Sequence, residues 1–284
     1  MGINALTLEW LGHLDDKGCF TGLNSVLELG PQDLHANHKN FLTWFRERVA
    51  KKSLDVNEMT QYKRIVQQMY WALGLKKYYS IDLTDSRADW LLDLNYPAPN
   101  LGQKFDVVVD IGTAEHIFNI GVYFQSIHEM TSEGGLMLHV LPAFGDTDHG
   151  FYNIHPTLYF DLAYENDYEI VDFVYVDNAG VRDRLRNNSD LSEPLIFESF
   201  PVQIKNDADL DIIDGTVTQQ MVLNLLLPET KAMWHDEAPG AILRDICHVA
   251  FRKKSNAAFR YPTQGYYRRN TWTIHEVPWD ESNN

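Results

Sequence analysis

The stretch that most constrains the fold is residues 104–116, KFDVVVDIGTAEH. Its centre, residues 107–109, is a run of three valines, and Asp110, Ile111 and Gly112 follow it. Such a dense β-branched run is typical of a strand buried on both faces, in the middle of a parallel sheet. Open α/β sheets bind their ligands beyond the carboxyl ends of such strands. We therefore expect the residues that follow the valines to lie at a functional edge.

The composition is that of a globular protein and restricts the classes of partner. The 284 residues are 44% hydrophobic and 23% charged, enough for one large α/β domain. A formal net charge of −16 disfavours nucleic acid, because phosphate binding needs a basic face. No apolar run approaches the ~20 residues of a membrane span, so we expect no membrane partner. Cys19 and Cys247 form neither a disulfide framework nor a zinc motif, and no signal peptide is seen, which favours a cytoplasmic location.

Strand and helix signals alternate along the chain, although residues 1–21 give no clear prediction. A strand at 25–29 stops at Gly30-Pro31, and helical spacing covers 40–74 with a break near 53–57. The remaining predictions, in chain order, are strands at 78–83 and 88–94, the central strand, a helix at 117–130, a strand at 136–141, a helix at 156–166, and strands at 169–176, 220–227 and 246–253. This alternation predicts a doubly wound, mostly parallel α/β sheet with helices on both faces and antiparallel pairing near the C-terminus.

The chain is expected to form a single domain. Its core would comprise about 22–178 and 216–256. The polar, weakly periodic stretch at about 179–215 is long for a connection, which indicates a lid-like insertion. The aromatic and arginine-rich tail, 257–284, would be an extended segment packed on the surface.

Acidic residues stand where successive predicted strands end. They are Glu28, Asp82 and Asp93. The carboxyl ends of parallel strands share one edge of the sheet, and a carboxylate after the second strand can accept two hydrogen bonds from a ribose diol. The glycine turn after the first strand, at Gly30, would let a cofactor approach the backbone.

Taken in order, five stretches resemble the motifs of the class I S-adenosylmethionine-dependent methyltransferases. They are VLELGPQ, YYSIDL, ADWLLDL, FDVVVDIGTAEH and HEMTSEGGLMLHVLP, within residues 25–176. HGFYN and PTQGYY also resemble methyltransferase-like proteins of bacterial surface-polysaccharide loci. The first stretch departs from the family pattern, because Pro31 and Gln32 stand where a second glycine is usual. That departure weakens the expected backbone cradle for the methionine part of the cofactor.

The resemblance implies S-adenosylmethionine as cofactor and S-adenosylhomocysteine as product. It places one group of residues near the methionine part (Glu28 and Gly30), one at the ribose and adenine (Asp82, Leu83, Asp93 and Leu94), and one at the methionine end beside the acceptor (Asp110, Gly112 and Thr113).

Methyl transfer to a hydroxyl also needs a base, and a histidine beside a carboxylate can serve near neutral pH. We predict His149 first and His116 second as catalytic residues. Substrate contacts are predicted for Glu115, Asp146, Tyr152 and His155. His139 lies inside a strand and is expected to be a paired core residue. Asp146, Asp148, His149 and His155 offer metal ligands, but closeness in sequence does not give ligand geometry, so no metal site is predicted.

The sequence therefore favours an S-adenosylmethionine-dependent methyltransferase with a small-molecule acceptor, methylated at oxygen, with a sugar or glycan precursor as the first guess. One alternative is a methyltransferase-like protein that binds a ligand and catalyses nothing. A nicotinamide-dependent oxidoreductase ranks lower, because ELGPQD lacks the G-x-G-x-x-G turn. A homodimer is left open.

Overall fold

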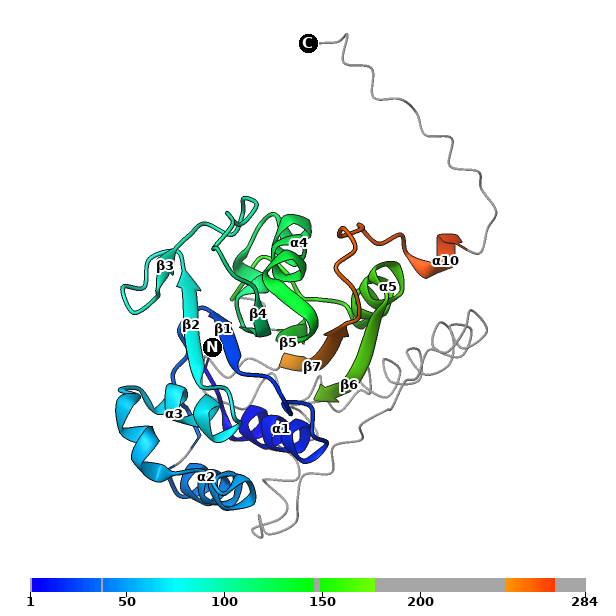
Figure 1. Cartoon of the computed structure of the whole chain (residues 1–284). Helices are drawn as coiled ribbons and strands as arrows, with labels where there is room; N and C mark the ends of the chain where they lie inside the picture. The colour runs from blue at the N-terminus through cyan, green and yellow to red at the C-terminus, as the bar shows by residue number, and fades with distance from the viewer. Residues whose placement is uncertain (1, 37, 146–148, 177–243, 269–284) are drawn as a thin grey trace.

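The computed structural model describes residues 2–36, 38–145, 149–176 and 244–268. Its strands form one seven-stranded sheet in the order β3-β2-β1-β4-β5-β7-β6 (Figure 1). Their bounds are β1 Ser25–Leu29, β2 Lys77–Asp82, β3 Trp90–Leu91, β4 Phe105–Ile111, β5 Thr131–Gly145, β6 Tyr168–Val176 and β7 Arg244–Lys253.

Strand pairing follows the prediction. β1 pairs in parallel with β2 and β4, and β4 pairs in parallel with β5. β7 lies antiparallel between β5 and β6. This order, with one antiparallel strand near the C-terminus, confirms the predicted class I methyltransferase-like fold. It places the ends of β1, β2 and β4 side by side at one edge.

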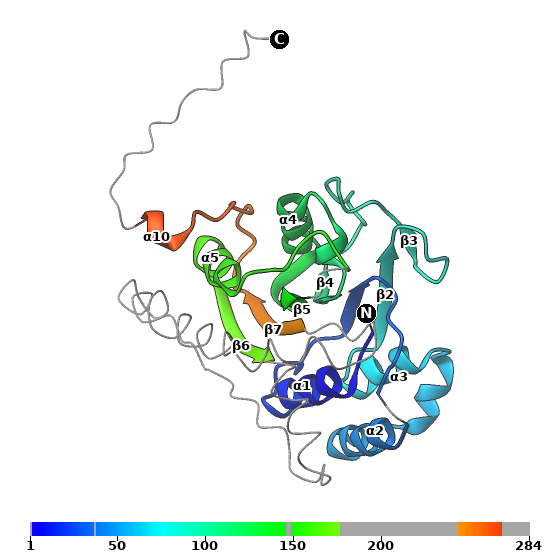
Figure 2. The same cartoon turned by 180° about the vertical axis from the view of Figure 1, so that it is seen from behind.

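Helices cover both faces of the sheet, as expected for a doubly wound fold (Figures 1 and 2). One face carries α1 Ala5–Asp16, α2 His38–Lys52, the 3₁₀ turn η1 Val56–Gln61 and α3 Ile65–Ala72. The other carries α4 Ile120–Met130 and α5 Pro156–Asn166. Between β4 and α4 lies the short 3₁₀ turn η2 Ala114–His116, and α10 Gly265–Arg268 ends the described part of the tail.

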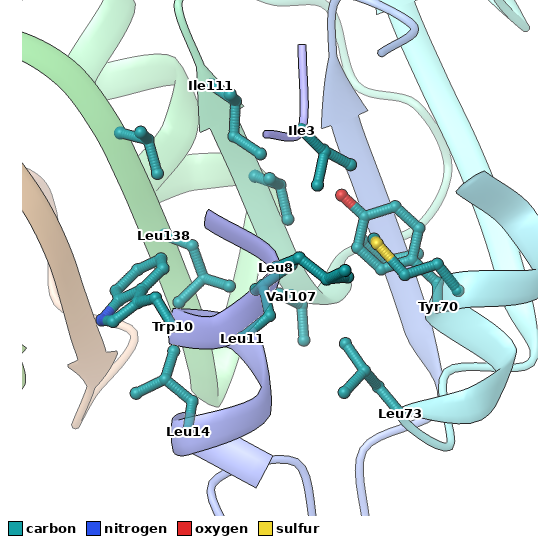
Figure 3. Packing of buried hydrophobic residues seen from close by; sticks show 14 of the residues in the cluster. Ile3, Leu8, Trp10, Leu11, Leu14, Tyr70, Leu73, Val107, Ile111 and Leu138 are labelled. Carbon is teal, nitrogen blue, oxygen red and sulfur yellow. The ribbon is translucent and has the colours of Figure 1, made fainter. Parts of the chain in front are cut away.

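The central strand β4 is buried on both faces. Val107, Val109 and Ile111 pack into the core beneath α1–α3, whereas Val108 packs beneath α4 and α5. Because side chains alternate across a strand, a valine run supplies both cores at once. The first core is drawn in Figure 3, where leucines of α1 face β4 and β5.

Helix α1 is the largest element that the sequence analysis missed. The Asn4 side chain caps it by accepting a hydrogen bond from the Thr7 amide at 2.9 Å. Leu8, Leu11 and Leu14 are all but fully buried (Figure 3), and each such burial stabilises the fold by about 1.5–3 kcal/mol. Two polar residues of this helix, Thr7 and Asp15, are buried as well, so the segment lacks a strictly apolar buried face that would predict a helix.

Several predicted boundaries need correction. The strand predicted at 88–94 shrinks to the two residues of β3, and the helix predicted from residue 117 begins at Ile120 after η2. The described part of the tail packs on α4 and α5 through Ala257 and Arg260, and it ends in the helix α10. The strand predicted at 220–227 and the insertion predicted at about 179–215 lie outside the described residues. Within the described residues, no helix has the length and apolar character needed to cross a membrane.

Candidate functional site

The turn after β1 is built around Gly30. Its φ is +77°, a value that favours glycine, and its amide donates to the Ile81 carbonyl at 2.7 Å. A Cβ at this position would lie 3.2 Å from Thr113 Oγ1 and 3.8 Å from Asp82 Oδ2. Gly30 therefore lies at a close polar junction between the ends of β1, β2 and β4, which we call the Gly30 cradle. Any side chain at this position would crowd the Thr113 hydroxyl.

Asp82 is the last residue of β2. One oxygen of its carboxylate is hydrogen-bonded to backbone amides, and the other points toward the Gly30 cradle. Oδ1 accepts hydrogen bonds from the Thr84 and Asp85 amides, both at 2.8 Å. Oδ2 accepts none from the part of the chain that the structure describes. Beside it, Leu83 is 61% exposed. A carboxylate oxygen next to an exposed apolar side chain suits a ligand with hydroxyl donors and a flat ring.

Asp110 organises the turn after β4. It is buried, and Oδ1 accepts from the Thr113 and Ala114 amides, both at 3.2 Å. Oδ2 lies 3.1 Å from Nδ1 of His139, which is buried and paired as predicted. Thr113 Oγ1 in turn donates to the Leu29 carbonyl at 2.6 Å. These bonds fix the β4 turn, which contains the buried Gly112 at φ +75°, against the end of β1.

Glu28 lies beneath the Gly30 turn, inside a buried network. Oε1 accepts from the Tyr70 hydroxyl at 2.9 Å, and Oε2 accepts from the Tyr78 hydroxyl at 2.5 Å and the Gln32 amide at 2.9 Å. Burial raises the pKa of the Glu28 carboxyl, although its three donors act in the opposite direction. These partners join β1, β2 and α3. Glu28 thus supports the turn from below, and its predicted contact with the methionine part stays a prediction.

Gln32 is a site residue that the sequence analysis did not select. It is 4% exposed, and its Nε2 donates to the Gly30 carbonyl at 3.0 Å. Arg64 Nη2 donates to the Gln32 carbonyl at 2.6 Å, so hydrogen bonds from two side chains, Gln32 and Arg64, stabilise the turn. The signal in the sequence was that Gln32 stands where the family pattern has a second glycine. In the structure, the Gln32 side chain closes the turn by its hydrogen bond to Gly30.

On the other side of the β4 turn, two histidines meet one carboxylate. Glu115 is buried, and its Oε1 lies 3.7 Å from His149 Nε2 and 3.9 Å from His116 Nε2. The two imidazole centroids are 4.7 Å apart. The stretches around His116 and His149, predicted as alternative sources of a base, therefore form a single Glu115–His116–His149 cluster.

The backbone fixes this cluster. The amides of Phe151 and Tyr152 donate to the Glu115 carbonyl at 2.7 and 3.3 Å. A Cβ at Gly150 would lie 2.7 Å from that same carbonyl oxygen, so only glycine allows this approach. The buried Tyr123 lies behind the cluster, and burial, reinforced by the neighbouring Asp110 and Glu115 carboxylates, raises the pKa of its hydroxyl.

Other predicted residues have local structural roles. Asp93 Oδ1 accepts from the Asn95 amide and side chain at 2.9 and 2.8 Å, and Leu94 is buried in the core. His155 caps α5, its Nδ1 accepting from the Thr157 amide at 3.2 Å. The Tyr152 hydroxyl donates to the Phe118 carbonyl at 2.8 Å. Their ligand contacts stay predictions, and Asp146 and Asp148 lie outside the described residues.

Two exposed aromatic rings flank the cluster. Phe118 is 70% exposed and Phe151 is 66% exposed, with ring centroids 6.0 Å apart in an edge-on arrangement. Each follows one of the clustered histidines by two residues. The aromatic density around residue 151 was visible in the sequence, but Phe118 was not singled out. Exposed rings beside polar groups form a surface suited to a ring-shaped ligand.

Comparison with known proteins leaves the family open. No family model matches the sequence, and no curated protein matches it. Among solved structures, similar ones include the O-methyltransferase of a polyketide synthase multienzyme from Brevibacillus brevis in complex with S-adenosylhomocysteine (15% identity, 89% of this chain and 73% of that one, TM-score 0.36). Another is a SAM-dependent methyltransferase from Archaeoglobus fulgidus (13% identity, 87% and 94%, TM-score 0.37). A third is the plantazolicin methyltransferase BpumL (11% identity, 88% and 84%, TM-score 0.40). At these TM-scores the fold assignment rests on the strand order of the sheet.

Proposed function

We propose that this chain is an S-adenosylmethionine-dependent methyltransferase that methylates an oxygen of a small-molecule acceptor. The observation that carries the proposal is the Gly30 cradle, where Gly30, Asp82 and Thr113 converge from three strand ends. It lies at the edge of the sheet where this fold class places its ligand.

The residues of the cradle suit the proposed cofactor. Asp82 Oδ2 would accept from the ribose hydroxyls, and Leu83 would lie against the adenine. Because Gly30 has no side chain, the methionine part would approach its backbone beside Thr113. The carboxylate of Asp82 also complements the positive charges of the cofactor. When bound, S-adenosylmethionine supplies an electrophilic methyl group.

The cluster would supply the base. His149 Nε2 or His116 Nε2 would receive the proton of the acceptor hydroxyl as its oxygen takes the methyl group. The methyl–sulfur bond would break in the same step, so the products would be the methyl ether and S-adenosylhomocysteine. Glu115, within 4 Å of both nitrogens, orients the imidazole that takes the proton. A positioned base contributes about 10²–10⁴-fold in rate, and alignment of the reacting groups contributes the rest.

Phe118 and Phe151 support a ring-shaped acceptor. Sugar rings have apolar faces that stack on aromatic side chains, and hydroxyls that could reach His116 and His149. A sugar or glycan precursor therefore stays the acceptor class that we propose.

The test is a calorimetric titration of the purified chain with S-adenosylmethionine, S-adenosylhomocysteine and NAD. Micromolar binding of the first two, weakened about 10- to 150-fold in Asp82→Asn, would support the proposal. Binding of NAD alone would overturn it. Release of S-adenosylhomocysteine would then be measured with a panel of hydroxylated sugars and phenols. Cofactor binding without turnover on any of them would favour the non-catalytic alternative.

A further inference from the structure

Three groups that can ligate a metal converge within the Glu115–His116–His149 cluster. Among the described residues, these three each offer one ligand atom, and those atoms all lie within 4.8 Å of one another. We propose that the cluster binds one divalent cation of the first transition row. The ligand set differs from the grouping considered from sequence, in which His149 was placed with Asp146, Asp148 and His155.

The distances are close to those of a bound site. Zinc–nitrogen and zinc–oxygen bonds of about 2.0–2.2 Å in a tetrahedral arrangement place neighbouring ligand atoms about 3.4 Å apart. Here Glu115 Oε1 lies 3.7 Å from His149 Nε2 and 3.9 Å from His116 Nε2. Movements of a few tenths of an ångström along these two contacts would bring them into range, and the ligand atoms of the two histidines lie within 4.8 Å of each other.

Burial and charge in the cluster also favour a bound cation. The Glu115 side chain is fully buried, whereas the side chains of His116 and His149 are 43% and 32% exposed. The carboxylate thus forms the floor, and the imidazoles form a rim through which an ion can enter. A buried carboxylate is favoured by a nearby positive charge.

The ligands are held by backbone, which distinguishes this cluster from a chance grouping of surface side chains. Asp110 Oδ1 caps η2 by accepting from the Ala114 amide at 3.2 Å. The Phe151 amide bonds to the Glu115 carbonyl at 2.7 Å, and Gly150 makes that approach possible. His149 is therefore fixed next to Glu115 by the turn that carries it. Metal sites need such outer-shell support of their ligands.

The donor set narrows the choice of ion. Two imidazole nitrogens and one carboxylate suit Mn²⁺, Fe²⁺, Co²⁺ or Zn²⁺ better than Mg²⁺ or Ca²⁺, which prefer oxygen ligands. With three protein ligands, positions are left for acceptor oxygens. An acceptor with two adjacent hydroxyls could chelate the ion, which would favour the alkoxide while the proton passes to solvent water. This role rests on the methyl transfer proposed above but replaces its histidine base, because a nitrogen bound to the ion cannot accept a proton. Binding of the ion itself does not depend on the proposed function.

The experiment uses the full chain after chelator treatment, titrated with Co²⁺ and followed by visible absorption, and with Zn²⁺ in the calorimeter. One equivalent per chain is expected. His116→Asn and His149→Asn should each weaken binding by at least about 10-fold. His155→Asn is the matched control, because asparagine also caps helices and His155 is outside the cluster. Circular dichroism checks that each variant is folded.

Absence of Co²⁺ and Zn²⁺ binding by the wild type would overturn this inference, as would equal binding by His149→Asn and His155→Asn. Titration of the same preparations with S-adenosylmethionine separates the two proposals. Cofactor binding without cation binding contradicts only the metal site. Cation binding that depends on both histidines, without cofactor binding, supports the metal site and contradicts only the proposed methyltransferase.

Discussion

The two halves of the candidate site are built differently. The half that we propose for the cofactor, called the cofactor half, is Gly30, Asp82 and Thr113; it follows three adjacent strands and is supported by the buried Glu28 network. The half that we propose for the acceptor, called the acceptor half, is the Glu115–His116–His149 cluster with its two exposed phenylalanines. In the first half backbone conformation and buried hydrogen bonds set the geometry, whereas in the second the functional groups are partly exposed side chains on short turns. Substitutions in the first half should therefore change cofactor affinity, whereas substitutions in the second half should leave it unchanged.

The largest effect is expected at Gly30. Gly30→Ala places a Cβ 3.2 Å from Thr113 Oγ1, inside the proposed cofactor space, and should weaken S-adenosylmethionine binding by at least about 100-fold, roughly 2.7 kcal/mol. Gly102→Ala is the matched control, because Gly102 has the same φ of +77° with nothing within 4 Å of its Cβ. Both variants should lose about 1–2 kcal/mol of stability from the left-handed backbone. Calorimetry and urea unfolding measure the two quantities. An equal loss of cofactor affinity in both variants would show that the Gly30 cradle does not bind the cofactor.

A smaller effect is expected at Asp82. Asp82→Asn keeps an acceptor for the Thr84 and Asp85 amides but removes the charge that would strengthen bonds from a ribose diol. Hydrogen bonds to charged groups contribute about 1.5–3 kcal/mol, so cofactor affinity should fall about 10- to 150-fold. Asp93→Asn should change it by less than about twofold, because Asp93 already bonds to Asn95. If Asp93→Asn instead lowers cofactor affinity to a comparable extent, Asp93 contacts the adenine as predicted from the sequence.

The Glu28 network predicts a pH effect on stability. Burial raises the pKa of Glu28 above its ordinary value of 4.5, so the folded state favours the protonated carboxyl. The contribution of Glu28 to the free energy of unfolding should then be largest below pH 4.5 and should fall as pH rises through the raised pKa. The glutamine side chain of Glu28→Gln cannot ionise. The stability of this variant should therefore increase relative to that of the wild type between pH 4.5 and neutral pH. Urea unfolding across this range measures the difference, and parallel curves for the two proteins would show that Glu28 does not titrate in it.

The sequence predicted much of the cofactor half because its signals are local. The valine run of β4, the glycine after β1 and the aspartate after β2 each lie within a few residues of the structure they specify. Strand order then brings them together without further information. What these signals could not show is that Glu28 faces Tyr70 and Tyr78, because that contact depends on the packing of α3 against β2.

The acceptor half was predicted only in pieces. Glu115 and His116 are neighbours in the chain, but the position of His149 depends on the length of β5 and on Gly150, which allows the turn to reach the Glu115 carbonyl. Helix α1 was missed for a related reason. Its buried Asp15 pairs with Arg48, and such long-range partners are not visible in a local pattern.

The smallest effect is expected at the exposed rings. Phe151→Ala should change the free energy of unfolding by less than about 0.5 kcal/mol, because the ring is 66% exposed and contributes little to the core. Phe124→Ala, at 6% exposure, should cost about 3–5 kcal/mol in the same urea experiment. Cofactor affinity of Phe151→Ala should stay within about twofold of the wild type, because the ring lies in the acceptor half. A loss of stability in Phe151→Ala close to that in Phe124→Ala would mean that this ring is part of the packing. A loss of cofactor affinity would mean that the two halves are coupled through the turn at Gly150.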